Sequence, residues 1–161
     1  MASQHTHRSE WKRLKEVAPD VDDILRTLGN AAAKAGLDKS TLELIKIRAS
    51  QINGCAFCLQ FHILAAERLG IPADKINLVT VWREVALFSV RERAALAWTE
   101  ALTLIPQGIS DELYADVSRE FDETELTYLT SAIAGINAWN RFGAAFRWSP
   151  PERVVKAAAA E

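Results

Sequence analysis

Apolar residues recur at helical spacing along most of the chain, in segments that end at glycine or proline. The clearest segment runs from Leu42 to Ile52 and stops at Asn53-Gly54, where a turn is expected. The helical spacing resumes at Cys55 and ends at Gly70, with Pro72 just beyond it. This pattern predicts two helices joined by a tight turn.

Further helices are predicted on both sides of this pair. They cover Val21 to Ala35, Ala73 to Val79, Val90 to Ile105, Ser110 to Phe121, and a long segment from Asp122 to just before Pro150. The buried side of the last helix is expected to comprise Leu126, Leu129, Ile133, Ile136, Phe142 and Phe146. Residues 80–88 lack a clear period and are expected to form a connector. Because no stretch combines alternating apolar residues with a hairpin turn, the predicted fold is all-α, a single-domain helical bundle.

The length of 161 residues corresponds to one domain of ordinary size. We divide the chain into an N-terminal leader (1–19), a helical domain (20–150) and a C-terminal tail (151–161) whose alanines favour a frayed helix. His5 and His7 lie in the polar leader, where solvated histidines are common, and we assign them no role.

Composition excludes several classes of partner. The net charge of −2 provides no basic surface for nucleic acid or for an anionic membrane. No apolar run approaches the roughly 18 residues that span a bilayer, and the N-terminal residues lack the apolar centre of a signal peptide. A cytoplasmic location is therefore expected. Neither a glycine-rich phosphate loop nor a nucleophile elbow is present, which argues against nucleotide-binding and hydrolase functions.

The chemistry is concentrated at the turn between the two central helices. The only cysteines of the chain, Cys55 and Cys58, fall at the predicted start of the second helix. Free N–H groups and partial positive charge at a helix N-terminus stabilise a thiolate and lower the thiol pKa. His62 lies one turn after Cys58 on the same face, where it can take the thiol proton.

Glu43 belongs to the preceding helix, twelve residues before Cys55. If the two helices run antiparallel, Glu43 falls near the depth of His62 and can orient it, directly or through a water. The alternatives are a solvated Glu43 paired with Lys46 and a His62 that is merely a satisfied core histidine. The spacing favours a relay from Glu43 through His62 to Cys58, with Cys55 as the resolving thiol.

The arrangement of one glutamate, a C-x-x-C and a histidine in LIKIRASQINGCAFCLQFH resembles the alkylhydroperoxidase (AhpD-like) branch of the carboxymuconolactone decarboxylase superfamily. The similarity extends through VWREVALFSVRERAALAWTEALT and AIAGINAWNRF, from about Asp38 to Phe146. The resemblance implies an all-helical fold that assembles into homo-oligomeric trimers or hexamers, and reduction of a hydroperoxide without a cofactor. It also implies that Cys58 is the peroxidatic cysteine, that Cys55 resolves it as a disulfide, and that an external dithiol or redox protein is the reductant.

The sequence departs from the family pattern at one position. Some members have a second histidine directly before the second cysteine, and here that residue is Phe57, which carries no proton. The departure weakens the expectation of efficient peroxidase turnover, while the dithiol and its histidine are retained.

Several alternatives remain open from the sequence. Cys55, Cys58, His62 and Glu43 form a possible zinc ligand set, although a carboxylate suits zinc less well than thiolate or imidazole. The cysteines can also be small buried hydrophobes, or the redox sensor of a non-catalytic helical module. Decarboxylation of a lactone follows from the superfamily name alone and needs no C-x-x-C.

Other candidate residues have weaker assignments. Four tryptophans are expected in the core or at a subunit interface rather than around a ligand: Trp82, Trp98, Trp139 and Trp148. Asn137, Asn140 and Arg141 can cap a helix, bind a neighbouring subunit or line a site, and the sequence does not choose among these roles.

Overall fold

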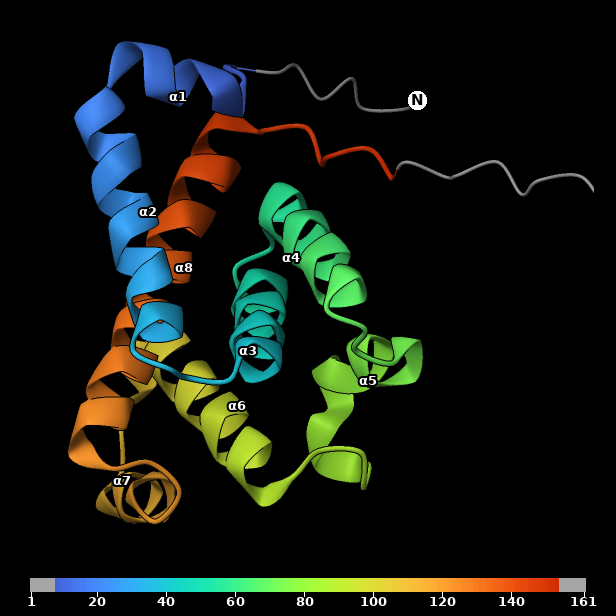
Figure 1. Ribbon diagram of the computed structural model, residues 1–161, viewed down its shortest axis with the longest axis vertical. Helices are drawn as coiled ribbons and strands as arrows, with labels where there is room; N and C mark the ends of the chain where they lie inside the picture. Colours follow the sequence, from blue (N-terminus) through green and yellow to red (C-terminus); the bar gives the residue numbers. More distant parts are fainter. Residues whose placement is uncertain (1–7, 154–161) are drawn as a thin grey trace, which may run out of the picture.

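The computed structural model describes residues 8–153, and its regular structure is helical (Figure 1). The α-helices in chain order are α1 Trp11–Val17, α2 Pro19–Lys34, α3 Lys39–Ile52, α4 Ala56–Arg68, α5 Ala73–Leu78, α6 Val90–Thr103, α7 Asp111–Ser118 and α8 Glu123–Phe146. Two 3₁₀ turns, η1 Val79–Glu84 and η2 Ile105–Gln107, flank α6. No strand occurs within residues 8–153, so the all-α prediction is confirmed for this range. His5, His7 and the alanine tail lie outside the described residues.

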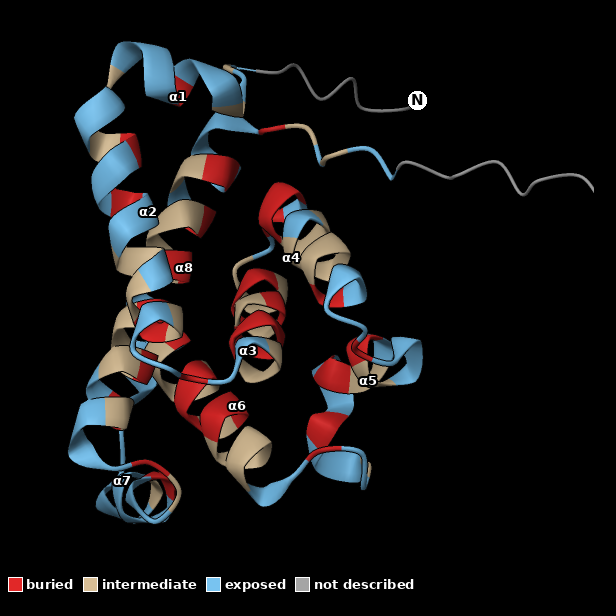
Figure 2. Cartoon of the chain, viewed as in Figure 1, coloured by how far each residue is buried: buried red, intermediate tan, exposed pale blue. Residues whose placement is uncertain are grey.

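Helix α3 lies at the centre of the fold and contacts α4, α6 and α8 (Figure 1). Apolar residues on several of its faces are therefore buried, including Leu44, Ile45 and Ile47 (Figure 2). Asp38 caps its start by accepting a hydrogen bond from the backbone N–H of Thr41 at 2.7 Å. A central helix fixed in this way is a rigid support for the side chains that α3 contributes to the site.

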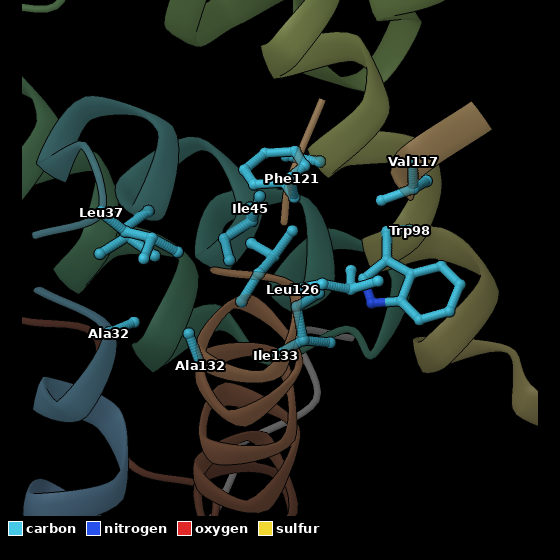
Figure 3. Close-up of a cluster of buried hydrophobic side chains, with 12 residues drawn as sticks. Ala32, Leu37, Ile45, Trp98, Val117, Phe121, Leu126, Ala132 and Ile133 are labelled. Carbon is cyan, nitrogen blue, oxygen red and sulfur yellow. The ribbon is translucent and has the colours of Figure 1, made fainter. Parts of the chain in front are cut away.

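The core consists of three clusters around α3. One joins α2, α3, α6, α7 and α8, and Figure 3 shows its Ile45, Trp98, Phe121 and Ile133 converging between these helices. A second lies between α3, α4, α5, η1 and α6. The third surrounds the two cysteines and includes Leu14, Phe57 and Trp148. Trp82, Trp98 and Trp148 are buried in these clusters, as expected, whereas Trp139 is only partly buried.

Most predicted helices are present, with shifted ends. Helix α6 stops at Thr103 and α7 at Ser118, two or three residues earlier than the apolar pattern suggested. The segment without a clear period contains the 3₁₀ turn η1, in which Trp82 is buried. Helix α1 was not predicted; it lies inside the segment assigned as a leader and buries Leu14.

The prediction for the end of α8 was wrong at one residue. Phe146 is 38% exposed rather than buried, because the helix ends there. Arg147 adopts a left-handed conformation, and the Trp148 N–H returns to the Gly143 carbonyl at 3.1 Å. The chain thus folds back so that Trp148, and not Phe146, covers the cysteines.

None of the helices within residues 8–153 combines the length and the apolar character of a membrane-spanning segment.

Candidate active site

The two cysteines occupy the first turn of α4, as the sequence predicted. Gly54, with φ of 65°, turns the chain after α3 so that Cys55 becomes the N-cap of α4. The Cys55 sulfur accepts the backbone N–H of Cys58 at 3.4 Å, and the two sulfur atoms are in hydrogen-bond contact at 2.9 Å. Both residues are buried. The sulfur atoms need to approach by less than about 1 Å to reach disulfide bonding distance.

The helix start does not affect the two thiols equally. The hydrogen bond from the Cys58 thiol outweighs the cost of burial and lowers the pKa of Cys55 to about 7. The same hydrogen bond, together with burial and the Cys55 charge, raises the pKa of Cys58. Two buried sulfurs in contact cannot both ionise readily, so they share one proton. Backbone hydrogen bonds at the helix start lower the pKa of both thiols, as expected, but in Cys58 the contact with Cys55 and burial outweigh them.

Glu43 and His62 are in direct contact. Glu43 Oε2 lies 2.7 Å from Nδ1 of His62, and Glu43 Oε1 accepts from Lys46 Nζ at 2.8 Å. Burial opposes ionisation of Glu43, but the hydrogen bond with His62 and the charge of Lys46 help to outweigh it, and the pKa of Glu43 is lowered. The predicted contact with His62 and the alternative contact with Lys46 are thus both present.

Burial dominates the protonation of His62. It lowers the pKa of the imidazole despite the opposing effect of Glu43, so His62 is neutral at pH 7. An ionised Glu43 has no proton to donate, so the hydrogen bond requires a proton on Nδ1 of His62. The other ring nitrogen, Nε2, is left as an acceptor. This tautomer suits a general base.

The two pairs meet at one cleft of about 250 Å³. Among the residues that the structure describes, Cys58, His62 and Glu43 line this cleft, whereas Cys55 does not. Within residues 8–153 no hydrogen bond joins His62 to either sulfur, and both His62 and Cys58 line the cleft. Cys58 is therefore the cysteine of the C-x-x-C that contributes to the wall of the cleft.

Helix α8 contributes two residues that the motif did not reveal. Asn140, left without a role by the sequence, is buried and donates to the Ser50 hydroxyl at 3.0 Å. Its carbonyl oxygen accepts from Asn53 at 2.9 Å, and its side chain is among the hydrogen-bonding groups that lower the pKa of both thiols. A Cβ at Gly143 would lie 2.6 Å from the Cys55 sulfur, so only glycine fits there.

The neighbours of Asn140 have structural contacts instead. Asn137 accepts from Asn53 at 2.9 Å and donates to the Thr103 hydroxyl at 3.1 Å. Arg141 is exposed and donates to the Asn137 carbonyl at 2.7 Å. The pair of Asn140 and Gly143, one turn apart on α8, was the available sequence signal for the close approach of α8 to the dithiol.

Phe57 makes the wall of the cleft aromatic. Its ring lies 5.8 Å from Trp11, 6.1 Å from Phe61 and 5.3 Å from Trp148, measured between ring centroids. At the position where some family members have a histidine, this chain thus has a buried hydrophobic contact with α1 and with the segment after α8.

The four candidate residues do not converge as metal ligands. No group of three or more His, Cys, Asp or Glu in the described part of the chain is arranged to hold a metal ion. Glu43 instead directs its two oxygens to Lys46 and His62.

Comparison with known proteins identifies the family of this chain. Residues 19–101 match the model of the carboxymuconolactone decarboxylase family. The uncharacterised protein YdfG of Bacillus subtilis is 38% identical over 131 residues, which cover 81% of this chain and 89% of YdfG. The chain belongs to the carboxymuconolactone decarboxylase family.

Two further comparisons identify this family member as AhpD-like. The alkyl hydroperoxide reductase AhpD of Corynebacterium aurimucosum is 35% identical over 68 residues, 42% of this chain and 36% of that protein. A crystal structure of ATU0492, a protein of unknown function from Agrobacterium tumefaciens, has a TM-score of 0.84 and 34% identity, covering 92% of this chain and all of that one. The resemblance inferred from the motif is thereby confirmed, and the fold is that of a single AhpD-like domain.

Proposed function

We propose that this family member is a thiol-dependent peroxidase that reduces hydroperoxides at Cys58. The observation that carries the proposal is a cleft lined by Cys58, His62 and Glu43, in which Cys58 belongs to a dithiol with Cys55. The alkyl hydroperoxide reductase among its relatives supports the same chemistry.

The first step oxidises Cys58. His62, neutral and with Nε2 as acceptor, takes the Cys58 proton, and the thiolate attacks the terminal peroxide oxygen. The S–O bond forms as the O–O bond breaks, which gives Cys58 sulfenic acid and an alkoxide. The alkoxide takes the proton from His62 and leaves as the alcohol. Glu43 stabilises the transient imidazolium through its 2.7 Å contact with Nδ1.

The second step closes the disulfide. Cys55 attacks the Cys58 sulfur as a thiolate. The S–S bond forms, the S–O bond breaks, and the departing hydroxide takes up the proton that Cys55 had released, giving water. An external dithiol or redox protein then supplies the two electrons that reopen the disulfide.

Assembly and location are part of the same proposal. Large apolar side chains are exposed on α1 and α2 and at the end of α4, among them Val17, Ile24 and Leu69. Such surfaces favour burial between copies of the chain, in a trimer or hexamer. A dithiol that must be reduced after every turnover suits the reducing cytoplasm.

The test is a thiol titration before and after one equivalent of cumene hydroperoxide, with metal content measured on the same sample. The wild-type protein should lose two thiols, and Cys58→Ser should neither lose its remaining thiol nor consume peroxide. Cys55→Ser should consume one equivalent and accumulate a Cys58 sulfenic acid that dimedone labels. Labelling of Cys55 in Cys58→Ser would reverse the two assignments.

Two experimental results would overturn the proposed peroxidase function in favour of another function. Unreactive thiols with stoichiometric zinc would indicate a metal-binding module. Consumption of a single equivalent per chain, even with excess dithiothreitol, would indicate a redox sensor rather than a peroxidase.

A further inference from the structure

We propose that the cleft beside Cys58 is a binding site for an uncharged aromatic hydroperoxide, one aryl ring on a short branched alkyl group. The inference rests on the proposed function for the reaction and on the walls of the cleft for the ligand. Nothing in the C-x-x-C motif specifies which hydroperoxide reaches the thiol.

The volume of the cleft suits a single substituted ring. An apolar cavity of about 150 Å³ holds benzene, so a cleft of about 250 Å³ has room for a ring with a small alkyl substituent. Hydrogen peroxide would leave most of that space to water. A long acyl chain or a fused ring system would extend beyond it.

Aromatic side chains from three helices form the walls. Trp11 of α1, Phe57 and Phe61 of α4 and Trp139 of α8 all line the cleft, together with Ile136. Phe61 packs on Phe57 at 6.1 Å and reaches the mouth, where it is 41% exposed. Offset and edge-to-face contacts with a ligand ring add to simple burial of apolar area, so these walls favour an aryl group over an alkyl group of similar size.

The two cations of the wall are already neutralised. The Arg26 guanidinium is held by both oxygens of Asp22, at 2.6 and 2.9 Å, and it lies 5.8 Å from the Trp11 ring and 5.7 Å from the Trp139 ring. Asp22 is 1% exposed, so an incoming anion that displaced it would leave a buried carboxylate unpaired.

Lys46 is neutralised in the same way by Glu43 at 2.8 Å. Two further ionisable residues line the wall. The pKa of Cys58 is raised by its contact with Cys55 and by burial, and His62 is uncharged at neutral pH because it is buried, although it forms a hydrogen bond with Glu43. The cleft therefore has no net charge to balance a carboxylate or phosphate on the substrate, and a neutral ligand is favoured.

The test separates binding from turnover by using the product alcohol. Binding of 2-phenyl-2-propanol to the reduced wild-type protein is measured by saturation-transfer NMR, beside tert-butanol and the anion 2-methyl-2-phenylpropanoate. We expect the aromatic alcohol to bind at least about tenfold more tightly than either of the other two. Phe61→Ala should weaken it about fivefold, while Tyr114→Ala, which removes an exposed ring on the distant α7, should not.

Peroxide kinetics complete the test. With dithiothreitol in excess, kcat/KM for cumene hydroperoxide should exceed that for tert-butyl hydroperoxide, and Phe61→Ala should reduce this preference mainly through KM. Equal binding of the two alcohols, or tighter binding of the anion, would overturn the inference whether or not peroxide is consumed. Selective binding of the aromatic alcohol without any peroxide consumption would uphold the ligand site and reject the proposed reaction.

Discussion

At the scale of single residues, Asn140 makes the most specific contribution beyond the motif. Its amide group lies buried between Ser50, Asn53 and the dithiol, and its hydrogen bonding lowers the pKa of both thiols. It therefore stabilises negative charge on sulfur in addition to the backbone N–H groups at the helix start. We regard it as a positioning residue, since it acts through the cysteines.

Asn140→Asp should shift the pH dependence of thiol reactivity upward. The substitution keeps the shape of the side chain but replaces an N–H donor with an oxygen, and an ionised carboxylate near the sulfur disfavours the thiolate. The midpoint for alkylation of Cys55 should rise from about 7 by roughly 1 unit or more, so the rate at pH 7 should fall. Iodoacetamide labelling from pH 5 to 10, followed by mass spectrometry, measures this midpoint.

Asn137→Asp is the matched control, because Asn137 lies one turn earlier and bonds to Asn53 and Thr103 instead of the thiols. Its midpoint should stay at the wild-type value. Equal shifts in both variants would mean that α8 acts through general charge and not through the Asn140 amide.

The spacing of the motif in the sequence identifies the four residues of the site, but it does not show which of them carry a proton. The spacing brings Cys55 to Cys58 and Glu43 to His62 because it fixes positions along two adjacent helices. Which sulfur keeps the proton depends on the hydrogen bond between the two sulfurs and on the N-cap position of Cys55, whereas Asn140 lowers the pKa of both thiols. Asn140 comes from a helix that starts about 70 residues later, and helical spacing predicts its place on that helix but not its distance from the dithiol.

At the scale of elements, the helices were predictable where periodicity and caps agree. Helix α8 begins with the predicted capping box of Asp122 and Glu125. Helix α1 was missed because its seven residues, WKRLKEV, are mostly charged and bury only Leu14. It is held by tertiary contacts such as that of Trp11 with Phe57, which periodicity cannot reveal.

The turn between α3 and α4 provides a stability prediction at this scale. Gly54 has a φ of 65°, so Gly54→Ala should destabilise the protein by about 1 kcal/mol through backbone strain. Gly29 lies inside α2 with open space around its Cα, so Gly29→Ala should instead stabilise it by about 0.5 kcal/mol. Urea unfolding of the two variants measures both changes.

The opposite signs make the pair informative. If Gly54→Ala proved as stable as the wild type, the left-handed turn would not be what sets Cys55 at the N-cap. Gly29→Ala also controls for the loss of a glycine as such, since both substitutions reduce the freedom of the unfolded chain equally.

At the scale of the whole molecule, the position of the buried dithiol predicts whether its oxidation changes the oligomeric state. The cysteines lie in a core cluster between α1, α3, α4 and α8, and the sulfur atoms are already 2.9 Å apart. Closing the disulfide therefore requires a local movement of less than about 1 Å between the two sulfurs. A movement this small is not expected to change the contacts between subunits during turnover.

We therefore expect the same oligomeric mass, a multiple of 17.8 kDa, in the reduced and the oxidised protein. Sedimentation velocity of both forms at the same micromolar concentration measures it, with Cys58→Ser treated identically to remove any effect of oxidation elsewhere. A change of mass in the wild type alone would mean that the disulfide is coupled to the subunit surfaces. The dithiol would then act as a sensor of the redox state, because a purely catalytic disulfide, formed and reduced in each cycle, gains nothing from dissociating the assembly.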